Sequence, residues 1–456
     1  MRDGNPTLPN TGLCEMMLSP QNLGVAVQNV KRNKGSAGVD GMEVEEIDAF
    51  MCQHWAYVEE LILARKYRPR PVKRVEIPKD NGGVRLLGVP CVIDRVIQQA
   101  MVQVMQPLFE ATFSEFSYGF RPGRSAEDAV RQAQTYMAEG YDHVVDLDLS
   151  KFFDTVDHDI LMGLVDKTLE DKDIRRLVWV YLRSGVMTDG CFERTLVGTP
   201  QGGPLSPLLA NIYLTPYDKE LERRTLKFVR YADDCNIFAR SKYASKQIEA
   251  NATKFLEKRL KLKVNRDKTE ARKAVGSSFL GFEFLTIGSS SNRSGLGVCR
   301  PKAKKLEKFK DRVREITSRS RGVGIGVVVG ELNGYIRGWL NYYARANMAS
   351  WVRDNASWAR RRVRQYLWKQ WKTAKNRKHQ LRLLGNEEWK LDKMCGYGAG
   401  RYWACSGRLG GLIPNKVLEE RYGLLDIDGY YRRLHEGRIC ADWLFLEGKK
   451  QLTFGF

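Results

Sequence analysis

The chain has 456 residues, of which 43% are hydrophobic, so it is long enough for about three domains with substantial cores and is not globally disordered. Its formal net charge is +21, and residues 301–390 contribute +16 of this, with 23 Lys or Arg against 7 Asp or Glu. Such a concentrated positive field predicts a polyanionic partner, with nucleic acid the first candidate and acidic lipid the alternative.

The cysteines and the apolar stretches argue against a secreted or membrane protein. None of the nine cysteines stands in a Cys-x-x-Cys pair, which argues against a disulfide framework and against a cysteine zinc site. The first residues lack the apolar core of a signal peptide. The most apolar stretch, residues 322–330, is far shorter than the ~20 residues that span a bilayer. We therefore expect a soluble cytoplasmic protein with no membrane partner.

The first elements are helices followed by a hairpin. Residues 21–66 show helical spacing of apolar residues, interrupted by a glycine-rich loop at 33–41. Lys73–Ile77 and Val84–Val89 are β-rich and predict a hairpin with a mobile, basic tip. Helical spacing then returns in two segments, Ile93–Phe109 and Ala126–Glu139.

The middle of the chain mixes strands with helices. Val144–Leu149 is a β-rich run. Beyond it we expect, in chain order, helices near 157–168 and 171–185, a loop and then an apolar helix over Gly198–Leu214, a hairpin of Phe228–Tyr231 and Cys235–Phe238, a helix at about 243–260 and a strand at Phe279–Phe284. Because the order has no regular βαβ repeat, we predict an α+β fold.

From residue 301 onward the sequence becomes helical and basic. A segment rich in Ser, Asn and Gly at 290–300 predicts a domain boundary. Three helices are expected beyond it, at Lys302–Thr317, Val327–Ala346 and Met348–Thr373.

Four aspartates in two of these strands predict a metal site. Asp233 and Asp234 fall where the second hairpin reverses, and Asp146 and Asp148 share one face of an otherwise apolar strand. Mg²⁺ prefers such oxygen ligands, and two-ion sites hold their cations about 3.5–4 Å apart. A solvated turn is the alternative interpretation of the adjacent pair. Spacing alone does not choose between Asp146 and Asp148.

Seven short motifs occur in one order along the chain: Ile77-Pro78-Lys79 with Arg85, Tyr118-Gly119-Phe120-Arg121-Pro122, Asp148-Leu149 with Phe152-Phe153-Asp154, Gly198-Thr199-Pro200-Gln201-Gly202, Tyr231-Ala232-Asp233-Asp234, Asn265-Arg266-Asp267-Lys268-Thr269 and Leu280-Gly281-Phe282. In this order they resemble the bacterial group II intron-encoded reverse transcriptases, in the form without a C-terminal endonuclease domain. The segment 332–343 resembles that family's thumb or maturase signature.

The resemblance implies an α+β right-hand polymerase, with fingers and an antiparallel palm sheet followed by an α-helical thumb. The implied domains are an N-terminal extension with the first finger elements at 1–66, fingers and palm at 67–290, a thumb or maturase domain at 300–375, and a basic RNA- or DNA-binding region at 376–456.

The implied activity is that of an RNA-directed DNA polymerase, a nucleotidyltransferase that uses two Mg²⁺ ions to add dNTPs to a primer 3′-hydroxyl. The implied partners are an RNA template with a DNA or RNA primer, the group II intron RNA, and target DNA. Such a retroelement protein would act in the bacterial cytoplasm, assisting the splicing of its intron and retrohoming.

The resemblance also assigns roles to residues. In the family's motif the metal-binding aspartate directly precedes an aliphatic residue and stands five positions before an aromatic one, which implies Asp148 rather than Asp146. Asp233, Asp234 and the Leu149 carbonyl complete the implied metal ligands. Phe153 takes the aromatic position that screens the sugar 2′ carbon, with plain core packing as its alternative.

Further residues are implied around the nucleotide. Lys79 and Arg85 flank the tip of the first hairpin and would reach the β- and γ-phosphates, although a solvated basic face is the alternative. Gln201 would contact the nucleotide and the templating base. Lys268 would protonate the departing pyrophosphate, with a simple salt bridge as its alternative.

The basic residues predict a grip on nucleic-acid phosphates. The predicted contacts are Arg121, Arg337, Arg353, Arg360, Arg361, Arg364, Lys369 and Lys372. Tryptophans at 351, 358 and 368 have helical spacing, which favours packing over base stacking. Two alternative functions remain: an RNA-binding maturase with an idle polymerase site, and a domesticated reverse transcriptase that works in defence or repair.

Overall fold

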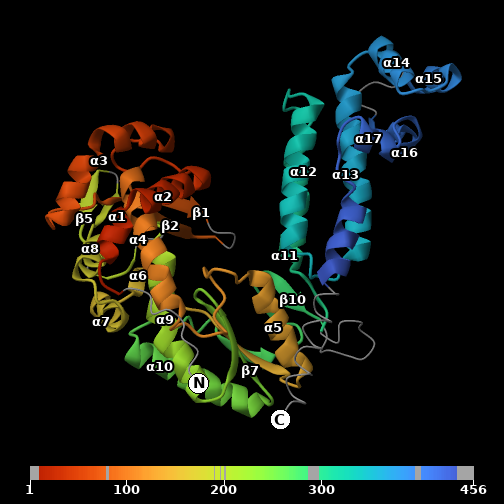
Figure 1. Cartoon of the computed structure of the whole chain (residues 1–456). Helices are drawn as coiled ribbons and strands as arrows, with labels where there is room; N and C mark the ends of the chain where they lie inside the picture. The colour runs from red at the N-terminus through yellow and green to blue at the C-terminus, as the bar shows by residue number, and fades with distance from the viewer. Residues whose placement is uncertain are drawn as a thin grey trace, which may run out of the picture. The chain divides into compact units, whose positions relative to one another are not determined.

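The computed structural model of the chain describes residues 10–78, 82–188, 190–195, 197–199, 202–285, 297–395 and 402–438. The chain divides into two compact units (Figure 1). The first unit comprises residues 1–136 and 141–274, and the second comprises residues 137–140 and 275–456. This division after Ala274 comes before the boundary expected near residues 290–300.

The N-terminal part of the first unit is helical. Its helices are α1 (Leu13–Leu18), α2 (Pro20–Asn33), the 3₁₀ helix η1 (Val44–Glu46), α3 (Ile47–Leu63) and α4 (Val92–Glu110). Helix α2 begins after Ser19, whose hydroxyl accepts a hydrogen bond from the backbone of Asn22, and a proline occupies its first position. Its apolar stripe packs against α4 and buries Ala26 and Val30. The loop predicted at 33–41 separates α2 from η1.

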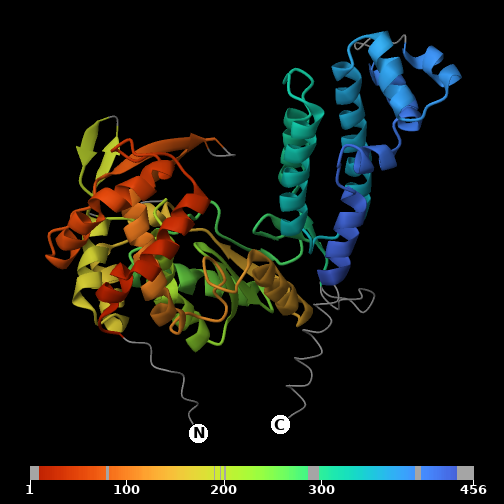
Figure 2. The same ribbon diagram turned by 45° about the horizontal axis from the view of Figure 1, so that its top comes forward.

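A sheet of four strands follows these helices. The hairpin of β1 (Val72–Pro78) and β2 (Val84–Val89) is antiparallel, as predicted. The sheet order is β2-β1-β4-β5, with β4 (Val186–Thr188) parallel to β1 and β5 (Cys191–Glu193) antiparallel to β4 (Figure 2). Neither β4 nor β5 is apparent in the sequence, because three-residue strands carry too short an alternation to recognise.

The second sheet, which we call the palm sheet, has the order β6-β7-β3-β8. Its strands are β3 (His143–Leu147), β6 (Lys227–Tyr231), β7 (Asp234–Ala239) and β8 (Glu270–Lys273). Strand β3 is antiparallel to both β7 and β8. The predicted hairpin of β6 and β7 is confirmed.

Helices cover both faces of the palm sheet. Val145, Leu147 and Ile237 belong to the same buried core as Leu256 of helix α10 (Lys242–Arg259). On the other face, the ring of Tyr136 contacts the ring of Phe238 at 5.6 Å. The remaining helices of this unit are α5 (Ala126–Ala138), α6 (Phe152–Thr155), α7 (His158–Thr168), α8 (Lys172–Leu182) and α9 (Ser206–Arg223).

The second unit begins with three short strands, β9 (Ser278–Phe279), β10 (Phe282–Phe284) and β11 (Cys299–Pro301). The single strand predicted at Phe279–Phe284 is therefore broken. Leu280 and Gly281 have φ angles of +50° and +85°, which reverse the chain between β9 and β10. The described helices of this unit include α11 (Ala303–Ile316), α12 (Ile325–Tyr342), α13 (Ala349–Gln370), α14 (Ala374–Leu383), α15 (Glu388–Cys395), α16 (Tyr402–Leu412) and α17 (Asn415–Glu420), and residues 427–438 are also helical.

The first three of these helices confirm the three predicted from the sequence. Helices α12 and α13 run alongside each other in both views (Figures 1 and 2). Aromatic rings join them to α11, since the Trp339 ring lies 4.8 Å from Phe309 and 5.2 Å from Trp351. Trp368 is fully buried, so packing accounts for this tryptophan, whereas Trp351 and Trp358 are half-buried. Over the described ranges, no helix is long and apolar enough to cross a bilayer.

Candidate functional site

The turn between β6 and β7 carries the two adjacent aspartates. Tyr231 and Asp234 are the last paired residues of the two strands, which leaves Ala232 and Asp233 as the turn itself. Ala232 has a φ of +57°, in the left-handed region, where a residue with a β-carbon costs about 1–2 kcal/mol. A turn of this kind persists only where the surrounding contacts hold it.

Asp148 lies just beyond the end of the neighbouring strand β3. The register of β3 and β7 pairs Leu147 with Cys235, so one further step brings position 148 across from position 234. Opposed residues of antiparallel strands have β-carbons about 5 Å apart and share a face of the sheet. The register therefore brings Asp148 and Asp234, which are distant in the sequence, to the same end of the palm sheet.

Residues of the loop before β8 hold Asp148. Asn265 Nδ2 donates to Asp148 Oδ2 at 2.9 Å, and Lys268 Nζ lies 3.8 Å from the same oxygen. The backbone N–H of Asp148 donates to Thr269 Oγ1 at 3.2 Å. Because the Lys268 side chain is 63% exposed, its ion pair contributes little to stability. Sequence reasoning named Lys268 but missed Asn265 and Thr269, although all three stand in one motif.

Electrostatics couple the aspartates to one another and to the first hairpin. Burial raises the pKa of Asp233 above its ordinary value, and the negative charge of Asp148 raises it further. The positive charges of Arg85 and Arg230 act in the opposite direction and lower this pKa. Asp148, Asp233 and Arg85 thus share one electrostatic neighbourhood.

Asp146 and Leu149 have structural contacts of their own. Asp146 accepts a hydrogen bond from Arg272 Nη2 at 3.1 Å, which gives it a cross-strand ion pair between β3 and β8. Leu149 is buried and forms an isolated antiparallel bridge with Val264. The bridge ties the segment after β3 to the loop that carries Asn265.

The donor chemistry at this end of the palm sheet suits a hard divalent cation. Carboxylate and carbonyl oxygens are the ligands that Mg²⁺ prefers, and burial, with a smaller contribution from the Asp148 charge, raises the pKa of Asp233. Within the part of the chain that the structure describes, no group of three or more His, Cys, Asp or Glu side chains is assembled closely enough to hold a metal. This end of the sheet therefore carries oxygen ligands of the kind that Mg²⁺ prefers, but the described residues do not assemble three of these side chains around one point.

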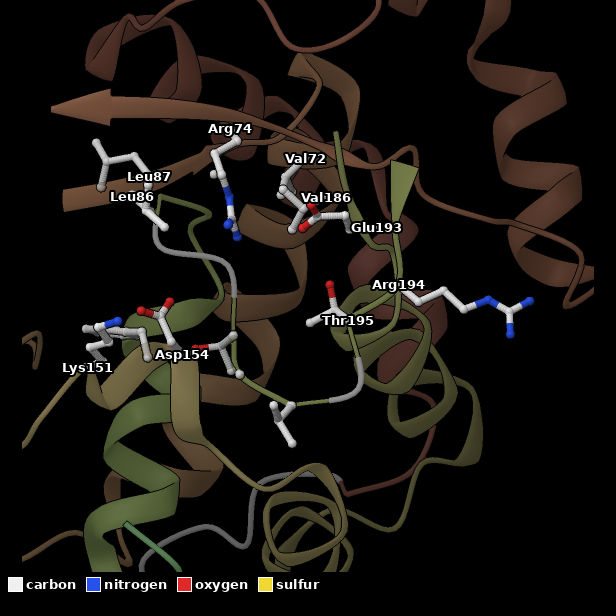
Figure 3. Close-up of a pocket in the computed structure, with 15 residues that line it drawn as sticks. Val72, Arg74, Leu86, Leu87, Lys151, Asp154, Val186, Glu193, Arg194 and Thr195 are labelled. Carbon is white, nitrogen blue, oxygen red and sulfur yellow. The ribbon is translucent and has the colours of Figure 1, made fainter. Parts of the chain in front are cut away.

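A cavity of about 420 Å³ lies in the first unit (Figure 3). Strands β1 and β2, the segment Lys151–Asp154, strand β4 and the segment after β5 line it. Phe153 belongs to this lining and is half-buried, with its ring 5.1 Å from that of Phe152. Arg74 and Lys151 also line the cavity and were not predicted.

The loop before α9, which contains Gly198 and Thr199, packs directly against the segment after Asp148, at residues 153–156. The N–H of Gly198 donates to the Val156 carbonyl at 2.7 Å, and the N–H of Thr199 donates to the Phe153 carbonyl at 2.6 Å. Gly198 has a φ of +90°, and a β-carbon there would lie 2.8 Å from the Phe153 oxygen. Glycine at this position therefore allows the two backbone segments to approach closely. Lys79 and Gln201 lie outside the described residues, while Arg85 is exposed on β2.

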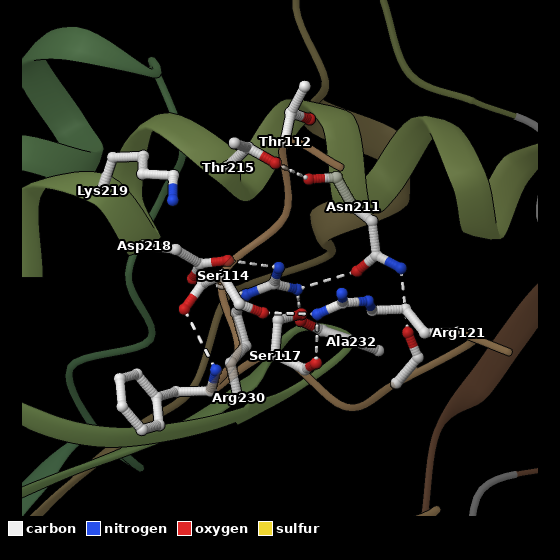
Figure 4. Close-up of polar contacts among 12 residues, drawn as sticks. Thr112, Ser114, Ser117, Arg121, Asn211, Thr215, Asp218, Lys219, Arg230 and Ala232 are labelled. Atoms are coloured by element: carbon white, nitrogen blue, oxygen red, sulfur yellow. Dashed lines mark hydrogen bonds and ion pairs between the residues drawn. The ribbon is translucent and has the colours of Figure 1, made fainter. Parts of the chain in front are cut away.

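A buried polar network supports the β6–β7 turn from below (Figure 4). Arg230 Nε and Nη2 donate to the two carboxylate oxygens of Asp218 at 2.7 and 2.6 Å. Arg230 Nη1 donates to the Ala232 carbonyl at 2.9 Å and to Asn211 Oδ1 at 3.0 Å. Asn211 Nδ2 in turn donates to the Gly119 carbonyl at 2.8 Å. This network holds the backbone on which Asp233 is mounted.

Gly119 packs directly against the backbone of the β6–β7 turn, which the absence of a β-carbon allows. A β-carbon at this position would lie 2.4 Å from the Ala232 nitrogen. Sequence reasoning missed the roles of Asn211, Asp218 and Arg230. The signal for Arg230 was available, since a charged residue inside an otherwise apolar strand requires a buried partner.

Two of the arginines predicted to bind nucleic acid lie in the protein interior. Arg121 is 7% exposed; it pairs with Glu110 at 2.6 Å and donates to the Ser117 carbonyl at 2.7 Å. Arg364 is 8% exposed and donates to the Ile413 carbonyl at 2.7 Å and to Asn415 Oδ1 at 2.6 Å. We revise both predictions, because guanidinium groups engaged inside the protein are not available to phosphates.

The other predicted cations lie at the surface of the second unit. Arg360 is half-buried, and the exposed members are Arg337, Arg353, Arg361, Lys369 and Lys372. Arg337 belongs to α12, and Lys372 follows the end of α13 with a φ of +43°. These side chains can meet a polyanion without rearrangement of the core.

Two family descriptions match the chain. Residues 77–284 match the reverse transcriptase (RNA-dependent DNA polymerase) family, and residues 306–384 match the group II intron, maturase-specific domain. The first range contains the palm sheet and most of the residues that line the cavity, and the second contains most of α11 and all of α12 and α13.

Curated relatives agree with these matches. Protein YkfC of Escherichia coli (strain K12) is 32% identical over 324 residues, which cover 62% of this chain and 84% of that protein. The group II intron-encoded protein LtrA of Lactococcus lactis subsp. cremoris is 35% identical over 221 residues, which cover 48% of this chain and 37% of LtrA. A solved partial Cas6-RT-Cas1–Cas2 complex matches 54% of this chain and 42% of its own, with 24% identity and a TM-score of 0.35. The chain belongs to the family of group II intron-encoded reverse transcriptases, RNA-directed DNA polymerases that carry a maturase domain.

Proposed function

We propose that this chain copies RNA into DNA at the exposed end of the palm sheet and assists its intron RNA in splicing and retrohoming. In this proposal Asp148, Asp233, Asp234 and the Leu149 carbonyl hold two Mg²⁺ ions. The observation that carries it is the strand register, which brings Asp148 opposite Asp234 at the end of the palm sheet where Asp233 forms the turn.

Bound Mg²⁺ would neutralise the charge that develops on the transferring phosphate and on the attacking 3′-oxygen. The chain itself supplies position. Asn265 fixes one oxygen of Asp148, and Arg230 fixes the carbonyl that precedes Asp233. Lys268, 3.8 Å from Asp148, is the proposed proton donor to the departing pyrophosphate.

The nucleotide would enter the cavity of about 420 Å³. Arg85, Arg74 and Lys151 offer positive charge to its phosphates, with Lys79 and Gln201 as further proposed contacts. Phe153 in the cavity wall would exclude a 2′-hydroxyl by its bulk. That steric barrier would favour dNTPs over ribonucleotides.

The basic second unit would bind the intron RNA, the RNA template with its primer, and target DNA. The exposed cations at 337, 353, 361, 369 and 372, with half-buried Arg360, are the proposed phosphate contacts. Such contacts are sequence-independent and fix the position of the nucleic acid.

Primer extension on an RNA template with Mg²⁺ tests the polymerase proposal. Asp233→Asn with Asp234→Asn should lower the rate at least about 100-fold, the scale of removing preorganised electrostatic stabilisation. Asp166→Asn is the control, since Asp166 lies at the surface, where its side chain is 49% exposed and pairs with Arg175. Unchanged extension by the double variant would remove the proposal. If the wild-type protein does not extend primers but still promotes splicing, the chain is a maturase with an idle polymerase site.

A further inference from the structure

A second pocket, of about 290 Å³, lies in the second unit between the end of α11 with the residues that follow it and the C-terminal half of α13. Four cationic residues line it, Arg314, Arg319, Arg362 and Lys369, together with the hydroxyls of Ser318 and Ser320. The lining contains no Asp or Glu. The pocket is built from two segments more than 40 residues apart, so the sequence pattern alone does not reveal it.

The pocket is preorganised around Arg362. Its Nε donates to Thr317 Oγ1 at 2.6 Å, and its Nη2 donates to the Arg314 carbonyl at 3.2 Å. The guanidinium carbons of Arg362 and Arg314 lie 5.6 and 5.7 Å from the centre of the Trp358 ring. Thr317 is itself buried and donates to the Val313 carbonyl at 2.5 Å. A guanidinium fixed in this way loses little conformational entropy when it binds an anion.

The lining of the pocket is cationic, because its residues include four Arg or Lys and neither Asp nor Glu. Arg314 pairs with Asp311 at 2.6 Å, and both side chains are more than half exposed, so water screens this pair. Arg362, Gln365 and Lys369 follow one another at intervals of three and four residues, which places them on one face of α13. The pocket is therefore a positively charged recess that continues as a stripe along the helix.

The chemistry of the lining is that of a phosphate contact. Phosphate oxygens of nucleic acids are bound by Arg and Lys together with Ser, Thr and Gln side chains, and each of these residue types lines this pocket. Arg314 and Arg362 lie over the ring of the neighbouring Trp358, so this ring is not available to stack on a base. The contact should therefore be indifferent to base sequence.

We propose that this pocket, lined by Arg314, Arg319, Arg362 and Lys369, binds a backbone phosphate of RNA. The inference deepens the proposed RNA-binding function and rests on it. RNA is favoured over DNA because the pocket lies within residues 306–384, the range that matches the maturase-specific domain. The bound phosphate would fix the position of an RNA strand relative to α11 and α13.

The test is equilibrium binding of the full chain to two labelled RNA hairpins of unrelated sequence, over a range of salt concentrations. Arg319→Ala with Lys369→Ala leaves the anchored Arg362 in place. It should weaken binding to both hairpins equally, by about tenfold at low salt, and lower the slope of log K against log salt by about 1–2. Lys246→Ala with Lys254→Ala on α10 removes the same charge from exposed positions of the first unit and should change neither quantity.

Three results would overturn the inference: an unchanged affinity and slope in the pocket variant, an equal loss in the α10 control, or a loss confined to one RNA sequence. DNA hairpins of the same sequences form a further arm, and a loss seen only with DNA would contradict the assignment to RNA. Protection of the 314–320 backbone from hydrogen exchange on addition of RNA to the wild-type chain is expected. If the wild-type chain binds no RNA at all, the proposed function fails rather than the pocket.

Discussion

Arg230 and Asp218 form a buried bidentate ion pair directly beneath the turn that carries Asp233. Their side chains are 1% and 0% exposed, and the same guanidinium donates to the Ala232 carbonyl at 2.9 Å. The Arg230 guanidinium thus joins the core to the turn. It neutralises Asp218 and also holds Ala232, whose φ lies in the left-handed region.

Because Arg230 both pairs with Asp218 and donates to the Ala232 carbonyl, variants can separate its effect on the stability of the fold from its effect on the position of the turn. Asp218→Ala should lower the free energy of unfolding by about 3–5 kcal/mol, because it leaves the Arg230 charge buried without its partner. Arg230→Met with Asp218→Leu should recover most of this loss, since an apolar pair of similar volume removes both buried charges. Chemical denaturation measures both changes.

The paired apolar variant should nevertheless be a poor polymerase, because nothing then donates to the Ala232 carbonyl. We expect primer extension to fall about tenfold or more, with the melting transition close to that of the wild type. Wild-type extension by this variant would show that the strands alone hold the turn and that Arg230 has no positioning role.

The close contact of Gly198 with the Phe153 carbonyl predicts a loss of nucleotide use. Gly198→Ala combines a φ of +90° with a β-carbon 2.8 Å from a backbone oxygen, so the loop must shift. We expect the KM for dNTP to rise several-fold in steady-state primer extension. Gly163→Ala in α7 is the control: its β-carbon meets nothing within 4 Å, and stability should rise by about 0.5–1 kcal/mol. Equal kinetics for the two variants would refute the contact's importance.

Asp94 predicts a pH dependence of stability. Burial raises its pKa to about 6, although Tyr67 and Tyr181 both donate hydrogen bonds to it, at 2.7 and 3.2 Å. A carboxyl group with a raised folded-state pKa binds more protons in the folded than in the unfolded chain, so stability falls as pH rises between about 4 and 6.

Asp94→Asn removes this titration. The difference in unfolding free energy between wild type and variant should therefore decrease by up to about 3 kcal/mol from pH 4 to pH 6 and stay constant above it. Denaturation curves at several pH values measure this. The surface variant Asp166→Asn should show no comparable trend, and a flat difference for Asp94→Asn would contradict the prediction.

Arg361 and Arg364 stand three positions apart on α13 and should behave in opposite ways. Arg361→Ala removes an exposed cation, so RNA affinity and its salt slope should fall while the melting temperature is unchanged. Arg364→Ala leaves the Ile413 carbonyl without its donor and should cost about 1–3 kcal/mol of stability. RNA titration and thermal melting of the two variants separate the roles. Equal RNA binding by Arg361→Ala and wild type would exclude that phosphate contact.

The sequence by itself determined the elements whose patterns are local. The β1–β2 and β6–β7 hairpins and helices α11 to α13 were predicted because alternation along a strand and spacing along a helix are properties of neighbouring residues. The order of the motifs was sufficient to identify the family, and through that resemblance it assigned Asp148, Asp233 and Asp234 to one proposed site.

Tertiary structure alone decided which charged groups face inward. Arg361 and Arg364 both lie on α13, yet only Arg364 is buried, because the Ile413 carbonyl and the Asn415 side chain, about 50 positions further along the chain, accept its hydrogen bonds. Asp146 pairs with Arg272, 126 positions further along the chain. These outcomes depend on contacts between segments far apart in the sequence, and desolvation and pairing of a charge are settled only where those segments meet.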